Sequence, residues 1–321
     1  GNKAMTSPAT LSSFIKWTAK NYPAKRNFLI FWDHGGGSVT GYGYDEKFPK
    51  SSSMTLDGIK EDLEDGKVKF DFVGFDACLM ATAETALMLN PYADYMIASE
   101  ETEPGIGWYY TNWLTELGND SSLSTLKIGK KISDDFVEMC AQRCRGQKTT
   151  LSLVDLAEFH SQVPERLAAF SKSVSKSLSE KKYKEISDAR YNSREFASSS
   201  KIDQIDLVDL CKNIDSSESK ELAKSLQSAI KYNKTSSNMT GAYGISIYFP
   251  YQRTSYVNKM CNTYKEIGMD EDYAKCIRQF ASMETSGQAA SSSSASLNAD
   301  GISSLLNALL TGSSGFLSDR A

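Results

Sequence analysis

Two apolar stretches decide the fold, residues 27–37 (NFLIFWDHGGG) and residues 70–81 (FDFVGFDACLMA). In each, a continuous apolar run ends abruptly, the first in Asp33-His34 and three glycines, the second at Cys78. Apolar runs bounded in this way are typical of strands that are buried on both faces of a parallel sheet. We therefore expect two such strands, with His34 and Cys78 at their carboxyl ends.

Helical patterns alternate with the apolar runs. Three helices are predicted early in the chain, at residues 8–21, 54–66 and 79–90, and the third follows Cys78 directly. Further strands are predicted at residues 95–99, 149–156 and 244–250, with long amphipathic helices between and after the last two. This alternation predicts a three-layer α/β/α fold with a mainly parallel central sheet.

Composition divides the chain into three parts. Residues 1–146 contain the candidate catalytic residues, and residues 147–281 are expected to complete the same domain. Residues 282–321 are rich in Ser, Ala and Gly and are predicted to be a linker with a short apolar tail, including a helix candidate at 302–310. Because the chain begins with Gly1 rather than Met, we expect a fragment or a processed form, in which an absent signal segment says nothing about export.

Charge and cysteine content exclude several classes of protein. The 321 residues include 36 basic and 40 acidic side chains, a net charge of −4, which gives no electrostatic case for a nucleic-acid partner. No apolar run approaches the roughly 18 residues that a membrane span needs. Six cysteines are few for this length, and none shows a zinc spacing with histidine nearby. We expect most of them to be buried as small apolar residues, and we predict no metal site.

His34 and Cys78 are the candidate catalytic pair. A cysteine between a strand and the start of a helix faces unpaired N–H groups and the positive end of the helix dipole, which favour the nucleophilic thiolate. A nearby imidazole can protonate a leaving amine, and Gly35 leaves a backbone N–H free to approach a developing oxyanion. The alternative is a buried cysteine and a histidine in a glycine turn. His160, the other histidine, is expected to lie partly exposed on an amphipathic helix without a catalytic role.

Three stretches carry a resemblance to a known family: FLIFWDHGGG, FVGFDACLMA and ASEETEPGIGWYYTNWL. They resemble clostripain-like cysteine peptidases, which are relatives of gingipains, legumain and separase, over roughly residues 7–280. The resemblance implies a caspase-like fold and cleavage after Arg or Lys. It also implies that His34 is the catalytic imidazole, Cys78 the nucleophile and Gly35 an oxyanion-hole donor. Relatives usually carry a further strand and helix ahead of the segment that begins here.

A preference for basic substrates needs carboxylates, because a partly buried cation requires charged partners. Asp76 is the first candidate, since it lies two residues before Cys78 and therefore on the same strand face. Glu101 is the second, within an acidic loop that also holds Glu100 and Glu103. The alternative for these residues is a solvated acidic loop. Trp108 is expected either to form a wall of the pocket or to pack in the core.

A polar, irregular segment, residues 38–53, separates the two catalytic motifs and is expected to lie outside the core. Mobile polar loops are preferred sites of cleavage, so self-processing is predicted here. Lys47 is the better candidate, because Pro49 lies one residue beyond its scissile bond, and Lys50 is the second. The alternative is an uncut surface loop.

The sequence thus predicts a cysteine endopeptidase that acts on proteins or peptides after Arg or Lys. Two alternatives are a catalytically silent binding or surface module with the same fold, and a thiol acyltransferase or amidase. The residues require no cofactor, although the resemblance allows for calcium. We expect a monomer without a membrane span, and the family implies a secreted or cell-surface location.

Overall fold

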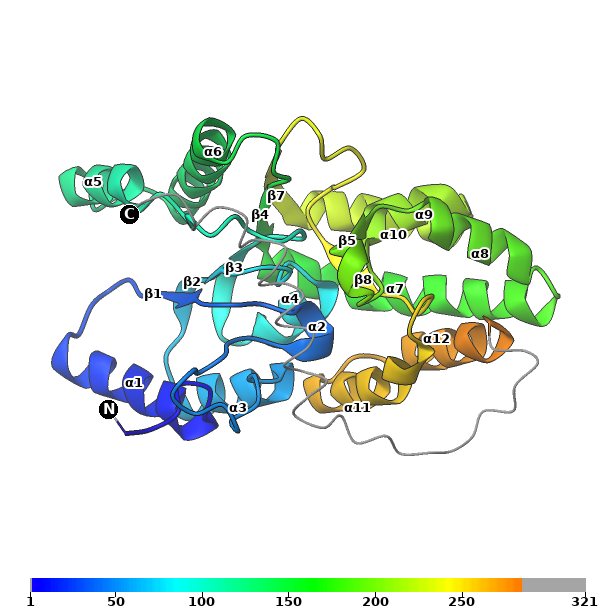
Figure 1. Ribbon diagram of the computed structural model, residues 1–321, viewed down its shortest axis with the longest axis horizontal. Coiled ribbons are helices and arrows are strands. Elements are labelled where there is room, and N and C mark those ends of the chain that lie inside the picture. The colour runs from blue at the N-terminus through cyan, green and yellow to red at the C-terminus, as the bar shows by residue number, and fades with distance from the viewer. Residues whose placement is uncertain (1, 285–321) are drawn as a thin grey trace, which may run out of the picture.

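The computed structural model describes residues 2–284. A five-stranded sheet with the order β1-β2-β3-β4-β7 forms its centre (Figure 1). The bounds of these strands are β1 Phe28–Trp32, β2 Phe70–Asp76, β3 Ala93–Ala98, β4 Thr150–Asp155 and β7 Ile230–Thr235. β1, β2 and β3 pair in parallel, whereas β4 is antiparallel to both β3 and β7. Four of the five strands therefore run the same way, which confirms the mainly parallel sheet predicted from the sequence.

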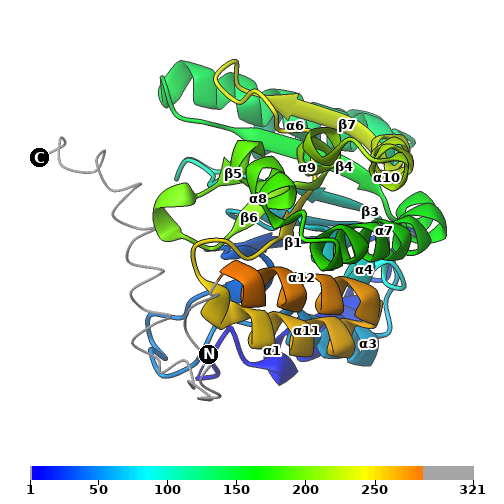
Figure 2. The ribbon, with the colours of Figure 1, turned by 90° about the vertical axis from the view of Figure 1, so that its right-hand side faces the viewer.

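Helices cover both faces of this sheet. α5 Tyr110–Asn119 and α6 Thr125–Arg143 lie on one side, and α1 Pro8–Asn21, α3 Leu56–Gly66, α4 Ala83–Leu89 and α7 Leu156–Ser179 lie on the other (Figure 1). On the same side as α1 and α3, α11 Val257–Ile267 and α12 Glu271–Glu284 lie next to each other (Figure 2). The remaining helices are α2 Gly37–Thr40, α8 Tyr183–Asn192, α9 Leu207–Ile214 and α10 Ser217–Ala229. The predicted three-layer α/β/α architecture is confirmed.

Alternate residues of the central strands enter different cores, as the period of a strand requires. Phe72 and Ile97 pack with Phe136 of α6 in one cluster, while Val73 and Met96 belong to the larger cluster on the opposite face. Burial on both faces explains why these strands read as continuous apolar runs in the sequence.

A small antiparallel sheet lies beside the main one. Its strands, in the order β5-β6-β8, are β5 Glu195–Phe196, β6 Gln204–Asp206 and β8 Ser246–Tyr248. The strand predicted at residues 244–250 therefore exists, but it belongs to this second sheet. β5, β6 and β7 were not predicted, because two of them are very short and the third, Ile230–Thr235 (IKYNKT), is mostly polar.

Two predictions about the loops that carry the catalytic motifs are wrong. α4 does not follow Cys78 directly: it begins at Ala83 after Thr82, whose hydroxyl accepts the N–H of Thr85 as an N-cap. The segment after His34 is not wholly outside the core either, since residues 38–43 are buried and Tyr42 pairs with both Gly35 and Met54. A polar segment can be buried when its backbone is satisfied in this way.

Within residues 2–284, no helix is both long and apolar enough to cross a membrane. α12 continues to Glu284, slightly beyond the start of the predicted linker. The helix candidate at 302–310 lies outside the described residues.

Candidate active site

A cavity of about 640 Å³ opens at the carboxyl ends of β1, β2 and β3, where ligands collect in open α/β sheets. His34, Gly35, Asp76, Cys78 and Glu101 all line it. The structure thus brings together five of the residues that the sequence singled out. The rest of the lining comes from the ends of β1 and β2, the loop after β3, the segment before β4 and the loop between β5 and β6: Trp32, Asp33, Ala77, Thr102, Glu103, Pro104, Gly105, Gly107, Gln147, Lys148, Ala197, Ser198, Ser199 and Ser200.

Asp33 holds the backbone of the histidine loop. Its carboxylate accepts the N–H of His34 at 2.6 Å and the N–H of Tyr44 at 3.1 Å. The carbonyl of His34 in turn accepts the N–H of Gly43 at 2.8 Å. The loop is therefore fixed on both sides of His34, so that the imidazole extends from a rigid backbone.

Gly35 lies against the backbone of Cys78. A Cβ at position 35 would be 2.0 Å from the carbonyl oxygen of Cys78, so only glycine allows the two catalytic loops to approach this closely. Two hydrogen bonds hold the adjoining turn, from Gly36 N–H to the carbonyl of Gly41 and from Gly43 N–H to that of His34. Neither uses the N–H of Gly35.

Cys78 is a half-buried thiol without a helix dipole, because α4 begins five residues later. Burial raises the pKa of this thiol to about 12, and the charges of Glu103 and Glu101 act in the same direction. The N–H of Glu103 donates to its Sγ at 3.1 Å and opposes the shift only in part. The predicted helix terminus at Cys78 is therefore absent, and burial favours the thiol over the thiolate.

Leu79, the residue after Cys78, adopts a left-handed backbone conformation with φ of 69°. For a residue with a Cβ this costs about 1–2 kcal/mol, so surrounding contacts have to maintain it. The N–H of Leu79 donates to the carbonyl of Glu101 at 3.2 Å, and its side chain is fully buried. The strained bend turns the chain immediately after the thiol.

Asp76 lines the cavity with its carboxylate buried and fixed. It accepts the N–H of Trp108 at 3.1 Å and the hydroxyl of Tyr110 at 2.9 Å. Burial raises the pKa of Asp76, while these two hydrogen bonds lower it in part. The side chain of Glu103 also bonds to it.

Glu103 is a site residue that the sequence does not single out from the other acids of its loop. Burial raises its pKa well above the ordinary value, and the neighbouring Asp76 carboxylate raises it further. This environment favours the protonated form of Glu103, whose side chain bonds to that of Asp76. One of its oxygens accepts Trp108 Nε1–H at 3.4 Å, and the other, Oε2, is buried without a hydrogen-bond partner among the described residues. Only folding shows that Glu103, rather than a neighbouring glutamate, is paired with Asp76.

Glu101 also lines the cavity, but its carboxylate binds backbone. Its Oε1 accepts the N–H of Thr102 at 2.9 Å and the N–H of Ala197 at 3.1 Å. Glu101 thereby ties the loop after β3 to the loop between β5 and β6. Trp108 is 3% exposed, packs in the core with Phe72 and Ile97, and reaches the cavity only through its N–H groups on Asp76 and Glu103.

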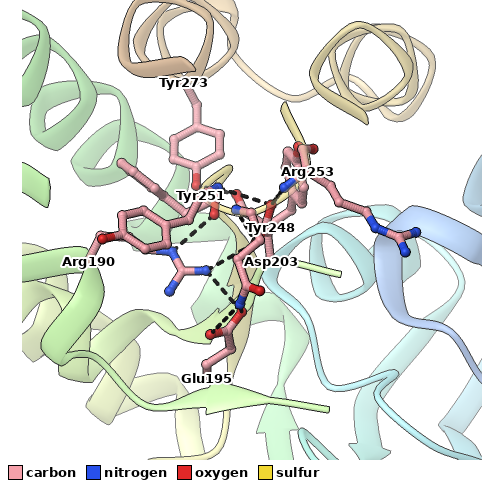
Figure 3. Close-up of polar contacts among 9 residues, drawn as sticks. Arg190, Glu195, Asp203, Tyr248, Tyr251, Arg253 and Tyr273 are labelled. Carbon is pink, nitrogen blue, oxygen red and sulfur yellow. Dashed lines mark hydrogen bonds and ion pairs between the residues drawn. The ribbon is translucent and has the colours of Figure 1, made fainter. Parts of the chain in front are cut away.

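The loop between β5 and β6 forms one wall of the cavity through residues 197–200. Its base is held by Arg190 of α8, which is only 1% exposed and pairs with Glu195 at 3.2 Å and Asp203 at 3.6 Å (Figure 3). The carboxylate of Asp203 also accepts the backbone N–H groups of Tyr251, Gln252 and Arg253. We refer to Arg190, Glu195 and Asp203 as the Arg190 cluster. It fixes a wall that sequence reasoning missed, because no motif marks this region.

Trp32 and the two candidate self-cleavage residues are exposed to solvent. Trp32 ends β1, lines the cavity and is 74% exposed. Lys47 and Lys50 are exposed on turns of the segment between the motifs. His160 is exposed on α7 and does not line the cavity.

All six cysteines are free, and four of them are buried, as predicted; Cys78 and Cys144 are the half-buried ones. Among residues 2–284, no group of three His, Cys, Asp or Glu side chains could hold a metal ion.

Comparison with known proteins identifies the family. The model of the clostripain family (Peptidase_C11) matches residues 2–296. Clostripain of Hathewaya histolytica is 28% identical over 151 residues, which are 40% of this chain and 28% of that protein, so the match spans about a quarter of the relative's length.

Solved structures share the fold. An inactive zymogen C11 protease from Parabacteroides distasonis superposes with a TM-score of 0.62 at 20% identity, over 83% of this chain and 77% of that one. A secreted C11 cysteine protease from Bacteroides thetaiotaomicron, in complex with an irreversible peptide inhibitor, gives 0.60 at 18% identity, over 83% and 78%. With the family model matching nearly the whole described chain, this protein belongs to the clostripain family of cysteine peptidases.

Proposed function

We propose that this chain is a cysteine endopeptidase that cleaves peptide bonds after Arg or Lys, with Cys78 as nucleophile and His34 as acid–base. The observation that carries the proposal is the shared cavity: His34, Cys78 and the Asp76–Glu103 carboxyl pair all face one space of about 640 Å³. A reactive pair and a recognition site for a cation are thus within reach of one bound peptide.

The raised pKa of Cys78 favours a thiol that is activated only when substrate is bound. His34 takes the proton as Sγ attacks the carbonyl carbon, and the Gly35 N–H donates to the oxyanion that forms. Collapse of this intermediate breaks the C–N bond, and His34 gives its proton to the leaving amine. Water then attacks the thioester, His34 accepts a proton from it, and the thiol leaves with that proton.

The preference for basic residues is supported by the Asp76–Glu103 pair. The two carboxyls share one proton, and no Lys or Arg among residues 2–284 balances them. A guanidinium or ammonium of the substrate would replace that proton and find the unpartnered Oε2 of Glu103. Asp76 is therefore proposed as the main contact of the substrate cation, with Glu103 beside it, whereas Glu101 is proposed to shape the wall.

Self-processing at Lys47, with Lys50 as the second site, is part of the proposal. Both side chains are exposed, and short turns hold the segment through Phe48 N–H to Asp45 O and Ser51 N–H to Phe48 O. Local turns of this kind open at little cost, so the segment can extend into a cleft. One structural neighbour is an inactive zymogen, and another is a secreted protease, which supports both processing and a secreted or cell-surface location.

The dyad is tested by substituting Cys78→Ala and His34→Ala in the full-length protein. Each should lower kcat for Arg- or Lys-peptide amides by about 10³-fold or more, since members of a catalytic unit fail together. His160→Ala is the matched control, because the same residue type is removed from an exposed position on α7 that does not line the cavity. Labelling with a lysine-based chloromethyl ketone should be lost in Cys78→Ala and retained in His160→Ala. Full activity of that variant would disprove the dyad, and a wild-type protein that neither hydrolyses nor labels would favour the silent binding module.

Self-processing is tested by incubating the wild-type protein and sequencing new N-termini by mass spectrometry. A new terminus at Phe48 or Ser51 that is absent in Cys78→Ala is the expected result. A chain that remains intact while it turns over substrate would contradict activation by cleavage.

A further inference from the structure

Gln204 of β6 reaches from the small sheet to both catalytic loops. Its side chain is fully buried, and Nε2 donates to the carbonyl of Leu79 at 2.9 Å. Leu79 directly follows Cys78, and 125 positions separate it from Gln204 in the chain. A polar side chain from a distant segment thus holds the backbone next to the proposed nucleophile.

The carbonyl that Gln204 holds belongs to a strained residue. Leu79 has φ of 69°, a conformation that residues with a Cβ seldom adopt, so its geometry depends on the groups that hold it. Two bonds do so: its N–H donates to the carbonyl of Glu101, and its carbonyl accepts Gln204 Nε2–H. Without the Gln204 donor, this peptide would be free to relax towards a common conformation, and Cys78 would turn with it.

The other end of the same amide faces the histidine loop. A Cβ on Gly37 would be 2.0 Å from Oε1 of Gln204, so the backbone that follows His34 packs directly against this oxygen. Oε1 itself is buried and has no hydrogen-bond partner among the described residues. The side-chain amide of Gln204 therefore contacts both the loop after His34 and the loop after Cys78.

Gln204 is itself rigidly placed. It lies on the middle strand of the small sheet, in register with Phe196 of β5 and Tyr248 of β8. The preceding residue, Asp203, belongs to the Arg190 cluster and accepts three backbone N–H groups (Figure 3). The amide is thus anchored at its base before it reaches the two loops.

We infer that Gln204 is a positioning residue for catalysis, which sets the relative placement of Cys78 and His34 through Leu79 and Gly37. It does not line the cavity, and so it acts through the loops rather than on substrate. The inference rests on the proposed function, because it takes Cys78 and His34 as the reacting pair. Misplacement of a reacting group by a fraction of an ångström slows chemistry more than it weakens binding.

The test is Gln204→Met in the full-length protein, which keeps the length of the side chain and removes the donor. Tyr273→Phe is the matched control, since its hydroxyl donates to the buried carbonyl of Tyr248 in the same small sheet but touches neither catalytic loop. For Gln204→Met we expect kcat to fall about tenfold to a hundredfold, with KM changed by less than about threefold. Tyr273→Phe should lower the melting temperature about as much as Gln204→Met does, and it should leave kcat near the wild-type value.

A wild-type kcat in folded Gln204→Met, or an equal loss of kcat in Tyr273→Phe, would overturn the inference. Cys78→Ala, measured alongside, separates this failure from a failure of the proposed function. If Cys78→Ala is active, the proposed dyad is wrong. If Cys78→Ala is inactive, the dyad stands and only the role inferred for Gln204 is wrong.

If Gln204→Met does not fold, Gln204→Glu decides. A neutral carboxyl can donate to the Leu79 carbonyl, whereas a carboxylate cannot. The kcat of Gln204→Glu, divided by that of wild type at the same pH, should therefore fall as the pH is raised from about 5 to 8, and near-UV circular dichroism would verify folding at each pH. A ratio that does not change with pH would overturn the inference.

Discussion

Asp203 and Asp76 are both buried aspartates that accept backbone N–H groups, but only Asp203 forms an ion pair within residues 2–284. Arg190 pairs with both Asp203 and Glu195, so one guanidinium is shared by two carboxylates. Asp76 has Glu103 as its neighbour instead, and the two share a proton. The difference teaches that this chain supplies a cation where buried carboxylates hold a wall together. At the cavity Asp76 and Glu103 have no such partner among the described residues, and under the proposed function the cation of a bound substrate would take that place.

The largest effect on stability is expected from removing the arginine of the Arg190 cluster. Arg190→Met should lower the free energy of unfolding by about 3–5 kcal/mol, because it leaves Asp203 and Glu195 charged without a cation. Urea unfolding measures this loss. Lys69→Met is the control, since Lys69 pairs with Asp94 on the surface, where an ion pair contributes about 1 kcal/mol or less. A loss below about 1 kcal/mol in Arg190→Met would show that the cluster is not a structural anchor.

Removing a carboxylate from the Asp76–Glu103 pair should affect substrate recognition rather than stability. Asp76→Asn is expected to raise KM for Arg and Lys substrates and to lower kcat/KM by about ten- to a hundredfold, the value of roughly 1.5–3 kcal/mol for a charge-assisted contact. The amide oxygen can still accept from Tyr110 and Trp108, so the fold should be kept.

The readout for this variant is the ratio of kcat/KM for Arg and Gln substrates. Asp71→Asn, at the other end of β2 and paired with Arg26, should leave that ratio unchanged. If Asp76→Asn discriminates as well as wild type does, Asp76 is not the cation contact.

The Asp76–Glu103 pair should also make substrate affinity depend on pH. The pKa values of Asp76 and Glu103 are both raised, so at low pH the pair holds its protons and carries little negative charge. As the pH rises, the protons leave and the affinity for a guanidinium increases. KM for an Arg substrate should therefore fall by up to about tenfold between acidic and neutral pH. Steady-state kinetics of Asp76→Asn should show a flatter dependence of KM on pH than wild type. Equal pH profiles would contradict a role of the Asp76–Glu103 pair in substrate affinity.

A third buried pair, Glu100 and Asp206, predicts the smallest effect. Neither is exposed, and burial raises the pKa of Asp206 to about 7 and that of Glu100 well above its ordinary value. Since the folded state binds the shared proton more tightly than the unfolded state does, stability is full below the unfolded value of 3.8 and is lost as the pH rises through about 7.

Glu100→Gln tests this, because the amide donates to Asp206 without a titrating proton. Between about pH 5 and 8, the melting temperature of wild type should fall by about 2–4 °C more than that of Glu100→Gln, which corresponds to about 1 kcal/mol. Parallel curves would mean that Asp209 and Glu101, the other acids facing the pair, set its behaviour.

The strands that carry the proposed dyad were predictable because they are buried on both faces and therefore read as unbroken apolar runs. The cavity at their carboxyl ends, with His34, Asp76 and Cys78, followed from that alone. What surrounds the dyad did not follow. Glu103 is one of several glutamates in its loop, and nothing in its sequence marks the one that meets Asp76.

The small sheet was missed for a different reason. β5 and β6 contain only two and three residues, too few for a periodic pattern. Their ends are held by the buried Arg190, which pairs with Glu195 and Asp203. The helix expected directly after Cys78 begins late because residues 77–82 bond to distant segments, as Leu79 does to Glu101 and Ala81 to Ser99. Long-range contacts of this kind override local helix propensity.

Trp32 gives the cleft an optical reporter. The chain has four tryptophans, of which Trp108 and Trp113 are buried, while Trp32 and Trp17 are 74% and 54% exposed. A quencher dissolved in water can therefore reach two indoles, and only Trp32 lines the cavity. A peptide that fills the cleft would shield one emitter and leave the other accessible, so occupancy becomes measurable by fluorescence without any label and even in Cys78→Ala, where no bond is cut.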